Sequence, residues 1–166
     1  MNKNLLILGA GQYGQVAKEI AEAMQCFGNI DFLDDCNSVA IGGLNDYIKL
    51  KNSYNCAVVA IGNAEVRLGW IEKLEECGYE VSTLIHPKSY VSPSAQVKMG
   101  CIVEPMAVIN TGCQIGVGCI ISAGAVVNHN AVCSLGVHVD CNATVMSNAV
   151  VPYGARVHSG TVFNKD

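Results

Sequence analysis

The side chains of this 166-residue sequence best suited to proton transfer are its four histidines, and His129 is the one whose setting suggests chemistry. Histidine titrates near neutral pH, so it can take a proton from an amine or a hydroxyl as that group attacks a thioester. The oxyanion formed in such an attack needs hydrogen-bond donors, most simply backbone N–H groups. The alternative is a surface histidine without a role, and the elements around His129 bear on the choice.

Those elements form a repeat with a period of six residues that runs from Ile85 to the end of the chain. The first residue of each hexad is apolar, the fifth is small or slim, and the fourth is usually Gly or Asn, which tolerate positive φ. This pattern is typical of a parallel β-helix in which three hexads make one coil of eighteen residues. The first positions are Ile85, Val91, Val97, Val103, Ile109, Ile115, Ile121, Val127, Cys133, Val139, Val145, Val151, Val157 and Phe163.

The repeat places His129 at the third position of its hexad, where a side chain points outward from the prism. Residues eighteen apart stack on one face, so His129 is expected to stack on Thr111 and Ser147 rather than on His138. The histidines of the repeat therefore form no stacked cluster within one chain. A metal site needs convergent ligands, and this spacing gives no support for one.

The first 84 residues read as a small α/β unit with a glycine-rich turn. Leu5 to Leu8 form an apolar run typical of a buried parallel strand, and GAGQYG at Gly9 to Gly14 leads into a helical pattern. Such glycines let the backbone approach a phosphate at a helix N-terminus. Asp34 and Asp35 end a second strand, at the spacing from which a carboxylate can reach a ribose hydroxyl. The alternative is a structural turn followed by a solvated acidic pair.

A third buried strand, Cys56 to Ile61, ends at Gly62 and Asn63, and the amphipathic segment Ala64 to Cys77 follows. Parallel sheets bind ligands at the carboxyl ends of their strands, so the glycine turn and the residues after the second and third strands are expected to converge. The unit is too short for two mononucleotide-binding halves. One nucleotide is therefore the more natural ligand.

Composition limits the remaining function classes. Hydrophobic residues make up 51% of the chain and charged residues 14%, which favours well-buried structure, and a net charge of −4 gives no reason to expect nucleic acid. Nine cysteines without a CxxC pair favour a reduced, cytoplasmic protein. No apolar segment has the length needed to span a bilayer.

Over essentially its whole length the chain resembles the sugar O/N-acyltransferases of the sialic-acid O-acetyltransferase and bacillosamine-pathway type. GAGQYG, FLDD at Phe32 to Asp35, AIGNAEVR at Ala60 to Arg67 and the His-Pro junction at His86 carry the resemblance. It implies a fold of the α/β plus β class. A small Rossmann-like N-terminal domain, residues 1–84, would bind a nucleotide-sugar, and a left-handed parallel β-helix, residues 85–166, would carry acyl transfer.

The resemblance also implies residue roles. In that family a catalytic histidine is followed nine residues later by a second histidine near the acetyl-CoA thioester, and His129 and His138 reproduce this spacing. Asn130 stands where the family usually has an acidic residue, so it is expected to orient His129 without stabilising the imidazolium by charge. The implied substrate-binding residues are Gly9, Gly11, Gln12, Tyr13, Gly14, Asp34, Asp35, Gly62, Asn63 and Arg67.

The expected activity is transfer of an acetyl group from acetyl-CoA to an amino or hydroxyl group of a nucleotide-linked sugar, without a metal. The family further implies a cytoplasmic homotrimer with acetyl-CoA in the groove between neighbouring subunits. The alternative is a nucleotide-sugar-binding relative with weakened catalysis, because the repeat ends at Asp166 and related chains have more coils along the acetyl-CoA channel. An NAD-dependent oxidoreductase is a weaker third hypothesis, since only repeat follows the glycine turn.

Overall fold

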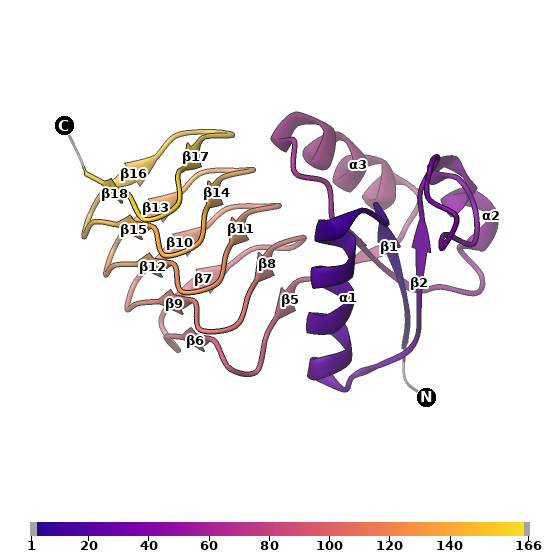
Figure 1. The fold of residues 1–166 in the computed structure, drawn as a ribbon, viewed down its shortest axis with the longest axis horizontal. Coiled ribbons are helices and arrows are strands. Elements are labelled where there is room, and N and C mark those ends of the chain that lie inside the picture. Colours follow the sequence, from indigo (N-terminus) through magenta and orange to yellow (C-terminus); the bar gives the residue numbers. More distant parts are fainter. Residues whose placement is uncertain (1–2, 165–166) are drawn as a thin grey trace.

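The computed structural model describes residues 3–164, which form two packed domains (Figure 1). The N-terminal domain is a parallel sheet in the strand order β2-β1-β3-β4, with helices on both faces. No helix within residues 3–164 combines the length and the apolar character needed to cross a membrane. The elements of this domain are β1 Lys3–Leu8, α1 Gln12–Met24, β2 Phe27–Leu33, the 3₁₀ turn η1 Leu44–Asp46, α2 Tyr47–Leu50, β3 Cys56–Val59, α3 Ala64–Glu76 and β4 Glu80–Val81.

The apolar run of β1 is buried on both faces of the sheet, as the sequence predicts. Leu5 and Ile7 pack in the hydrophobic cluster that contains α1, whereas Leu6 and Leu8 pack in the cluster that contains α3. Alternate residues of a strand point to opposite faces, so a strand covered on both sides must be apolar throughout. This central strand fixes the positions of the two long helices.

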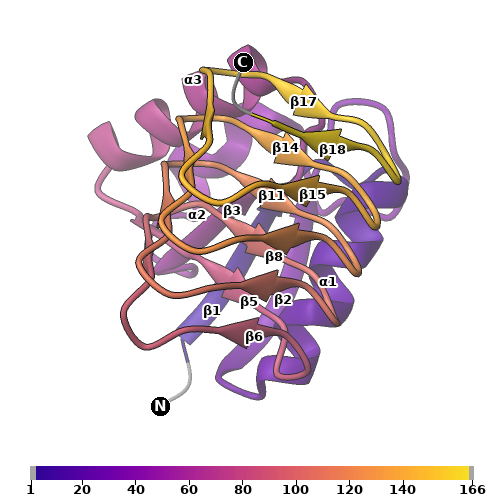
Figure 2. The ribbon, with the colours of Figure 1, turned by 90° about the vertical axis from the view of Figure 1, so that its left-hand side faces the viewer.

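The C-terminal domain is a β-helix whose coils stack along one axis (Figure 2). Its short strands form three parallel sheets, in the orders β16-β13-β10-β7, β17-β14-β11-β8-β5 and β18-β15-β12-β9-β6. Paired residues are eighteen apart, as in Ile120 and His138, which confirms the predicted coil length. The strands are β5 Leu84–Ile85, β6 Tyr90–Val91, β7 Gln96–Val97, β8 Ile102–Val103, β9 Val108–Ile109, β10 Gln114–Ile115, β11 Ile120–Ile121, β12 Val126–Val127, β13 Val132–Cys133, β14 His138–Val139, β15 Thr144–Val145, β16 Val150–Val151, β17 Arg156–Val157 and β18 Val162–Phe163.

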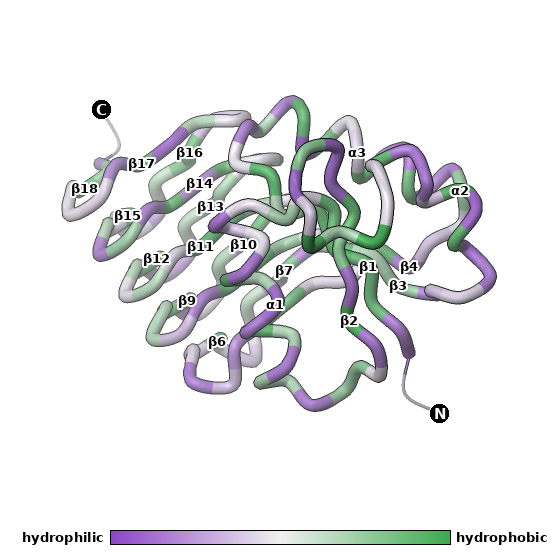
Figure 3. The backbone as a smooth tube through the Cα atoms, turned by 45° about the vertical axis from the view of Figure 1, so that its right-hand side comes forward, coloured by the Kyte–Doolittle hydropathy of each residue, from purple (hydrophilic) through white to green (hydrophobic). Residues whose placement is uncertain are grey.

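The interior of the prism is filled by the first and fifth residues of the hexads, and hydrophobic segments accordingly recur in each coil (Figure 3). The predicted Gly and Asn turns adopt positive φ, for example Gly124 at 70° and Asn142 at 55°. Met106 is an exception, because it takes φ 64° at the same turn position with an exposed side chain. We also expected one strand from Tyr79 to Leu84. The chain instead forms β4 and then β5, since Leu84 already pairs with the β-helix strand β8.

The two domains share a buried interface. Helix α1 packs against β5, and Leu84 and Ile102 of the β-helix belong to the same apolar cluster as α1 (Figure 1). Arg67 of α3 is fully buried and reaches across the interface. Its guanidinium donates to the carbonyls of Ile61 and Gly62 at 2.7 and 2.9 Å, and it donates to two β-helix turns, at Gly118 and Gly136, over 2.7 and 2.8 Å. Arg67 therefore joins the loop after β3 to the side of the prism.

We expect Arg67→Met to lower the free energy of unfolding by roughly 3 kcal/mol or more, because buried carbonyls lose their donors. Denaturant titration followed by circular dichroism measures this. Lys49→Met is the matched control: Lys49 is exposed and forms a surface ion pair with Asp46, so its removal should leave the midpoint unchanged. Equal midpoints for the two variants would show that Arg67 does not hold the domains together.

Candidate functional site

The glycine turn lies at the carboxyl end of β1 and begins helix α1. Gly11 is the N-cap residue of α1, and Gly11 and Gln12 are exposed. A Cβ on Gly14 would lie 2.2 Å from the carbonyl oxygen of Gly9, so only glycine lets the helix start this close to the strand end. This close packing of helix and strand is the role of the third glycine in such a turn. Contact of the turn with a phosphate stays a prediction.

The acidic pair after β2 lies beside this turn. Asp34 accepts hydrogen bonds from the backbone N–H groups of Ala10, Cys36 and Asn37, at 2.8, 2.9 and 3.0 Å. These bonds, the one from Ala10 foremost, lower the pKa of Asp34. Asp35 accepts from the N–H of Leu44 at 2.8 Å. Both carboxylates bind backbone donors and so shape the wall beside the glycine turn. Their expected contact with substrate stays a prediction.

Gly62 and Asn63 follow β3 and complete the same edge of the sheet. Asn63 caps α3 by accepting from the N–H of Val66 at 3.0 Å. The backbone of Gly9 lies close to that of Ala60, since a Cβ on Gly9 would be 3.0 Å from the Ala60 carbonyl. The predicted convergence of the three strand ends is thus observed. Their role in nucleotide binding stays a prediction.

Two of the expected substrate residues face the domain interface instead of the open edge. Arg67 is 0% exposed and its donors bind four carbonyls, so the structure replaces the expected substrate contact with a structural role. The hydroxyl of Tyr13 is buried and forms no hydrogen bond to the described residues. Burial, followed by the nearby carboxylate of Glu104, raises the pKa of Tyr13 well above its ordinary value.

His129 lies on the turn between β12 and β13, at the corner where the two sheets not covered by α1 meet. Its side chain is exposed, and its Nδ1 is 3.2 Å from the hydroxyl of Ser147 one coil away, which confirms the predicted stacking. Asn130 takes φ 57°, and its N–H bonds to the carbonyl of Thr111. Ser147 is the side chain that contacts the His129 ring. The orienting role of Asn130 stays a prediction.

His138 lies on β14, in the sheet that faces the N-terminal domain. Its side chain is 17% exposed, and its Nε2 is 3.0 Å from the hydroxyl of Ser122 and 3.9 Å from Asp140. Burial lowers the pKa of His138 to about 4, although the Asp140 carboxylate opposes the shift. Asp140 is itself bound by Arg156, at 2.5 and 3.1 Å. His138 is therefore a neutral ring at physiological pH.

The fold does not bring His129 and His138 together within one chain. His129 occupies the corner opposite the sheet that carries His138, so the body of the prism separates them. The glycine turn lies on the His138 side, since Tyr13 at its end is close to Glu104 of the same sheet. One chain alone thus presents a predicted nucleotide edge with His138, and a separate corner with His129.

Sequence reasoning missed the polar residues around His138. The eighteen-residue spacing could have found them, because they occupy the position just after the inward residue in successive coils of one sheet. Their backbone bonds confirm this alignment, as in Glu104 N to Ile121 O and Ser122 N to Val139 O, both 2.9 Å. The column consists of His86, Glu104, Ser122, Asp140 and His158.

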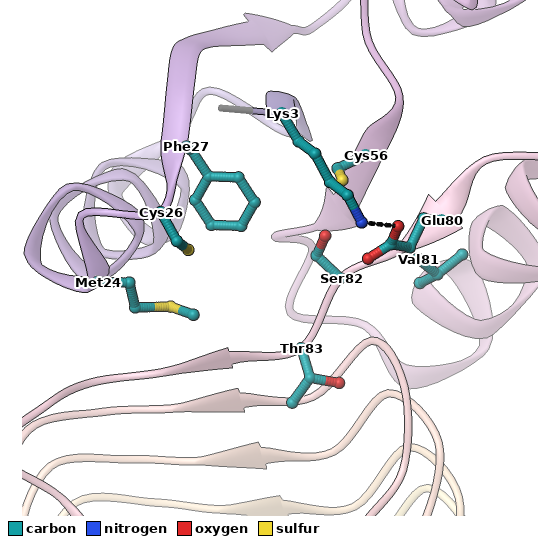
Figure 4. Close-up of a pocket in the computed structure, with 9 residues that line it drawn as sticks. All are labelled: Lys3, Met24, Cys26, Phe27, Cys56, Glu80, Val81, Ser82 and Thr83. Atoms are coloured by element: carbon teal, nitrogen blue, oxygen red, sulfur yellow. Dashed lines mark hydrogen bonds and ion pairs between the residues drawn. The ribbon is translucent and has the colours of Figure 1, made fainter. Parts of the chain in front are cut away.

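A cavity of about 480 Å³ lies away from these residues, at the amino ends of β1 and β3 (Figure 4). Lys3 and Glu80 form an ion pair at its rim, and Cys56 lines its floor. Ligands of parallel sheets bind at the opposite, carboxyl ends of the strands. Within residues 3–164 no three His, Cys, Asp or Glu side chains are grouped so as to hold a metal ion.

Comparison with known proteins connects both domains to one family. Residues 4–74 match the family model of the PglD N-terminal domain. The acetyltransferase domain of PglB from Neisseria gonorrhoeae FA1090, solved in complex with acetyl coenzyme A, is 30% identical with a TM-score of 0.94, over 98% of this chain and 82% of that one.

Two more distant structures share the fold. A mutant of perosamine N-acetyltransferase from Caulobacter crescentus, in complex with CoA and GDP-perosamine, is 21% identical with a TM-score of 0.64, over 96% of this chain and 90% of that one. WeeI from Acinetobacter baumannii AYE is 16% identical with a TM-score of 0.73, over 96% and 87%. The match to the PglB domain runs through the glycine turn, the interface and the coils that carry both histidines, and the chain therefore belongs to the left-handed β-helix sugar acetyltransferases.

Proposed function

We propose that this protein transfers an acetyl group from acetyl-CoA to an amino or hydroxyl group of a nucleotide-linked sugar, with His129 as the general base. The observation that carries the proposal is the match of the whole chain to an acetyltransferase domain solved with acetyl-CoA. That match does not favour the alternative of a binding protein with weakened catalysis. The strand ends at Gly9 to Gly14, Asp34 and Gly62 supply the edge on which the nucleotide would lie.

The geometry of His129 suits a base. If Nδ1–H donates to Ser147, the lone pair of Nε2 is free to face the substrate. The attacking amine or hydroxyl forms a bond to the acetyl carbon and passes its proton to Nε2. The tetrahedral intermediate then collapses, the carbon–sulfur bond breaks, and the CoA thiolate receives the proton from the imidazolium. Asn130 is the proposed orienting neighbour.

The positions of the two histidines support a site shared between copies of the chain. A nucleotide-sugar on the sheet edge of one copy is on the His138 side and cannot reach the His129 corner of that copy. A neighbouring prism can bring its His129 there, which agrees with the expected homotrimer. Four of the five outward residues of the sheet next to His129 are apolar: Tyr90 and Val162 are exposed, and Val108 and Val126 are half-buried, whereas the fifth is Thr144. This face suits contact with a second copy.

We expect His129→Gln to lower kcat at least 100-fold, because general-base catalysis contributes about 10²- to 10⁴-fold. The assay follows CoA thiol release from acetyl-CoA with a panel of UDP-, GDP- and CMP-linked amino sugars. His158→Gln is the control. His158 is also exposed on a β-helix turn, but it lies between β17 and β18 and therefore at a different corner of the prism from His129. Absence of release by the wild type with every acceptor would reject the acetyltransferase proposal.

Mixing two impaired variants tests whether the site is shared. When His129→Gln and His138→Gln chains assemble at random, about one interface in four pairs an intact His129 with an intact His138 of its neighbour. Coexpression should therefore recover about a quarter of wild-type activity. Mass spectrometry must show mixed assemblies, and mixed assemblies without recovered activity would place both histidines in a site within one chain.

The pH profile separates the two histidines. A general base works only when unprotonated, so activity falls as the pH drops through the titration of the base. With a pKa of about 4, His138 takes up its proton only below pH 5 and adds nothing to a loss of activity between pH 8 and 5. We expect His138→Gln to lower activity while leaving the midpoint of this profile in place. A shifted midpoint would assign the titration to His138.

A further inference from the structure

A row of neighbouring polar side chains leads from the glycine turn to His138, and the proposed chemistry does not account for it. It begins at Tyr13 of the turn, passes the carboxylate of Glu104, and continues through the turn that carries Ser122. These residues come from three separate segments of the chain. Tyr13 belongs to the N-terminal domain, whereas Glu104, Ser122 and His138 lie in successive coils of the β-helix.

Glu104 is the buried centre of this set. It is 8% exposed and forms no ion pair with the described residues, so its charge relies on hydrogen bonds. Its Oε2 accepts the N–H of Ala123 at 3.0 Å, one coil away. That bond supports the turn just after Ser122. Loss of the carboxylate would leave this turn without its side-chain acceptor.

Ser122 is the contact between this turn and the imidazole. It is 2% exposed, and its hydroxyl lies 3.0 Å from Nε2 of His138. A ring nitrogen that is occupied in this way is not available to a ligand, so Nδ1 is the nitrogen that remains. The bond also limits rotation of the ring, because Ser122 itself is held in the backbone ladder by Val139.

Tyr13, on the opposite side of the interface, lies near the same carboxylate. Its hydroxyl is buried near Glu104 but makes no hydrogen bond to the described residues. Buried hydroxyls nearly always have partners. A small movement of the glycine turn toward the β-helix would let Tyr13 donate to Glu104, which connects the nucleotide edge to the His138 side.

We propose that Glu104 and Ser122 are positioning residues for His138: Ser122 occupies Nε2, Glu104 holds the Ser122 turn, and Nδ1 faces the acetyl donor. This inference rests on the proposed function, in which His138 contacts acetyl-CoA. The two residues act on the reaction only through the imidazole. Their removal therefore weakens the use of acetyl-CoA and leaves the binding of a nucleoside diphosphate intact.

The first experiment reads the ring directly. Nitrogen-15 NMR of the imidazole groups reports which ring nitrogen carries the proton, and His138→Gln assigns the His138 signals. Ser122→Ala and Glu104→Ala should shift both His138 nitrogen signals. Ser122→Thr keeps the hydroxyl and Glu104→Gln keeps an oxygen acceptor, so these two variants should show the wild-type signals. Unchanged His138 signals in both alanine variants would overturn the inference, whether or not acetyl transfer is detected.

The second experiment uses steady-state kinetics. Misplacement of a contact group costs roughly 10- to 100-fold, so we expect kcat/KM for acetyl-CoA to fall by that factor in both alanine variants and to recover in the conservative ones. The Kd for UDP or GDP, measured by calorimetry, should stay the same. Asp31→Asn is the matched control, because Asp31 is a carboxylate paired with Tyr54 at 2.6 Å on the outer part of the sheet.

The outcomes separate the two proposals. If the wild type transfers no acetyl group but the ring signals respond, the proposed function fails and the positioning of His138 stands. If the wild type is active and Ser122→Ala matches it in kcat/KM and in ring signals, the positioning inference fails alone. An equal response to Asp31→Asn would show a general loss of structure and would also reject it.

Discussion

The backbone ladder between coils is the constraint on which the rest of the structure depends. Each strand of the prism bonds to the strand eighteen residues away, as in Ile120 N to Val137 O and His138 N to Ala155 O, both at 2.9 Å. Backbone groups buried in a prism must find such partners, so the register cannot slip by one residue without turning the core outward. The ladder thereby arranges every side chain in columns. The polar column at the domain interface and the stacking of His129 on Ser147 both follow from it.

The second constraint is the attachment of the N-terminal domain to this prism. Helix α1 shares an apolar cluster with the first coils, and Arg67 binds carbonyls on both sides of the joint. A buried guanidinium is tolerated only where its donors are satisfied, and here four carbonyls do so. The attachment determines which face of the prism lies beside the predicted nucleotide-binding edge. It is the face of His138, and His129 lies at the opposite corner.

Under the proposed function, this division separates the two histidines of one chain and assigns them to a site shared between copies. The proposed base is exposed on a turn, where it is free to meet a substrate held by another copy. The proposed acetyl-CoA contact is half-buried and held by Ser122 in the interior of the interface. The exposed residue suits proton exchange, and burial keeps the other neutral. The two environments match two different tasks.

By itself the sequence determined the fold class, the eighteen-residue coil, the inward residues and the turns with positive φ, because these depend on local periodicity and on side-chain size. It also predicted the convergence of Gly9 to Gly14, Asp34 and Gly62, since parallel strands end at a common edge. Only the tertiary structure decided that Arg67 is a buried link, that Asp34 binds backbone donors, and that Ser122 contacts His138 while Glu104 binds the turn beside Ser122. The position of Arg67 depends on how the two domains pack, and the contacts of Asp34, Ser122 and His138 depend on loop and side-chain conformations. Periodicity along the chain aligns residues in columns but does not encode these contacts.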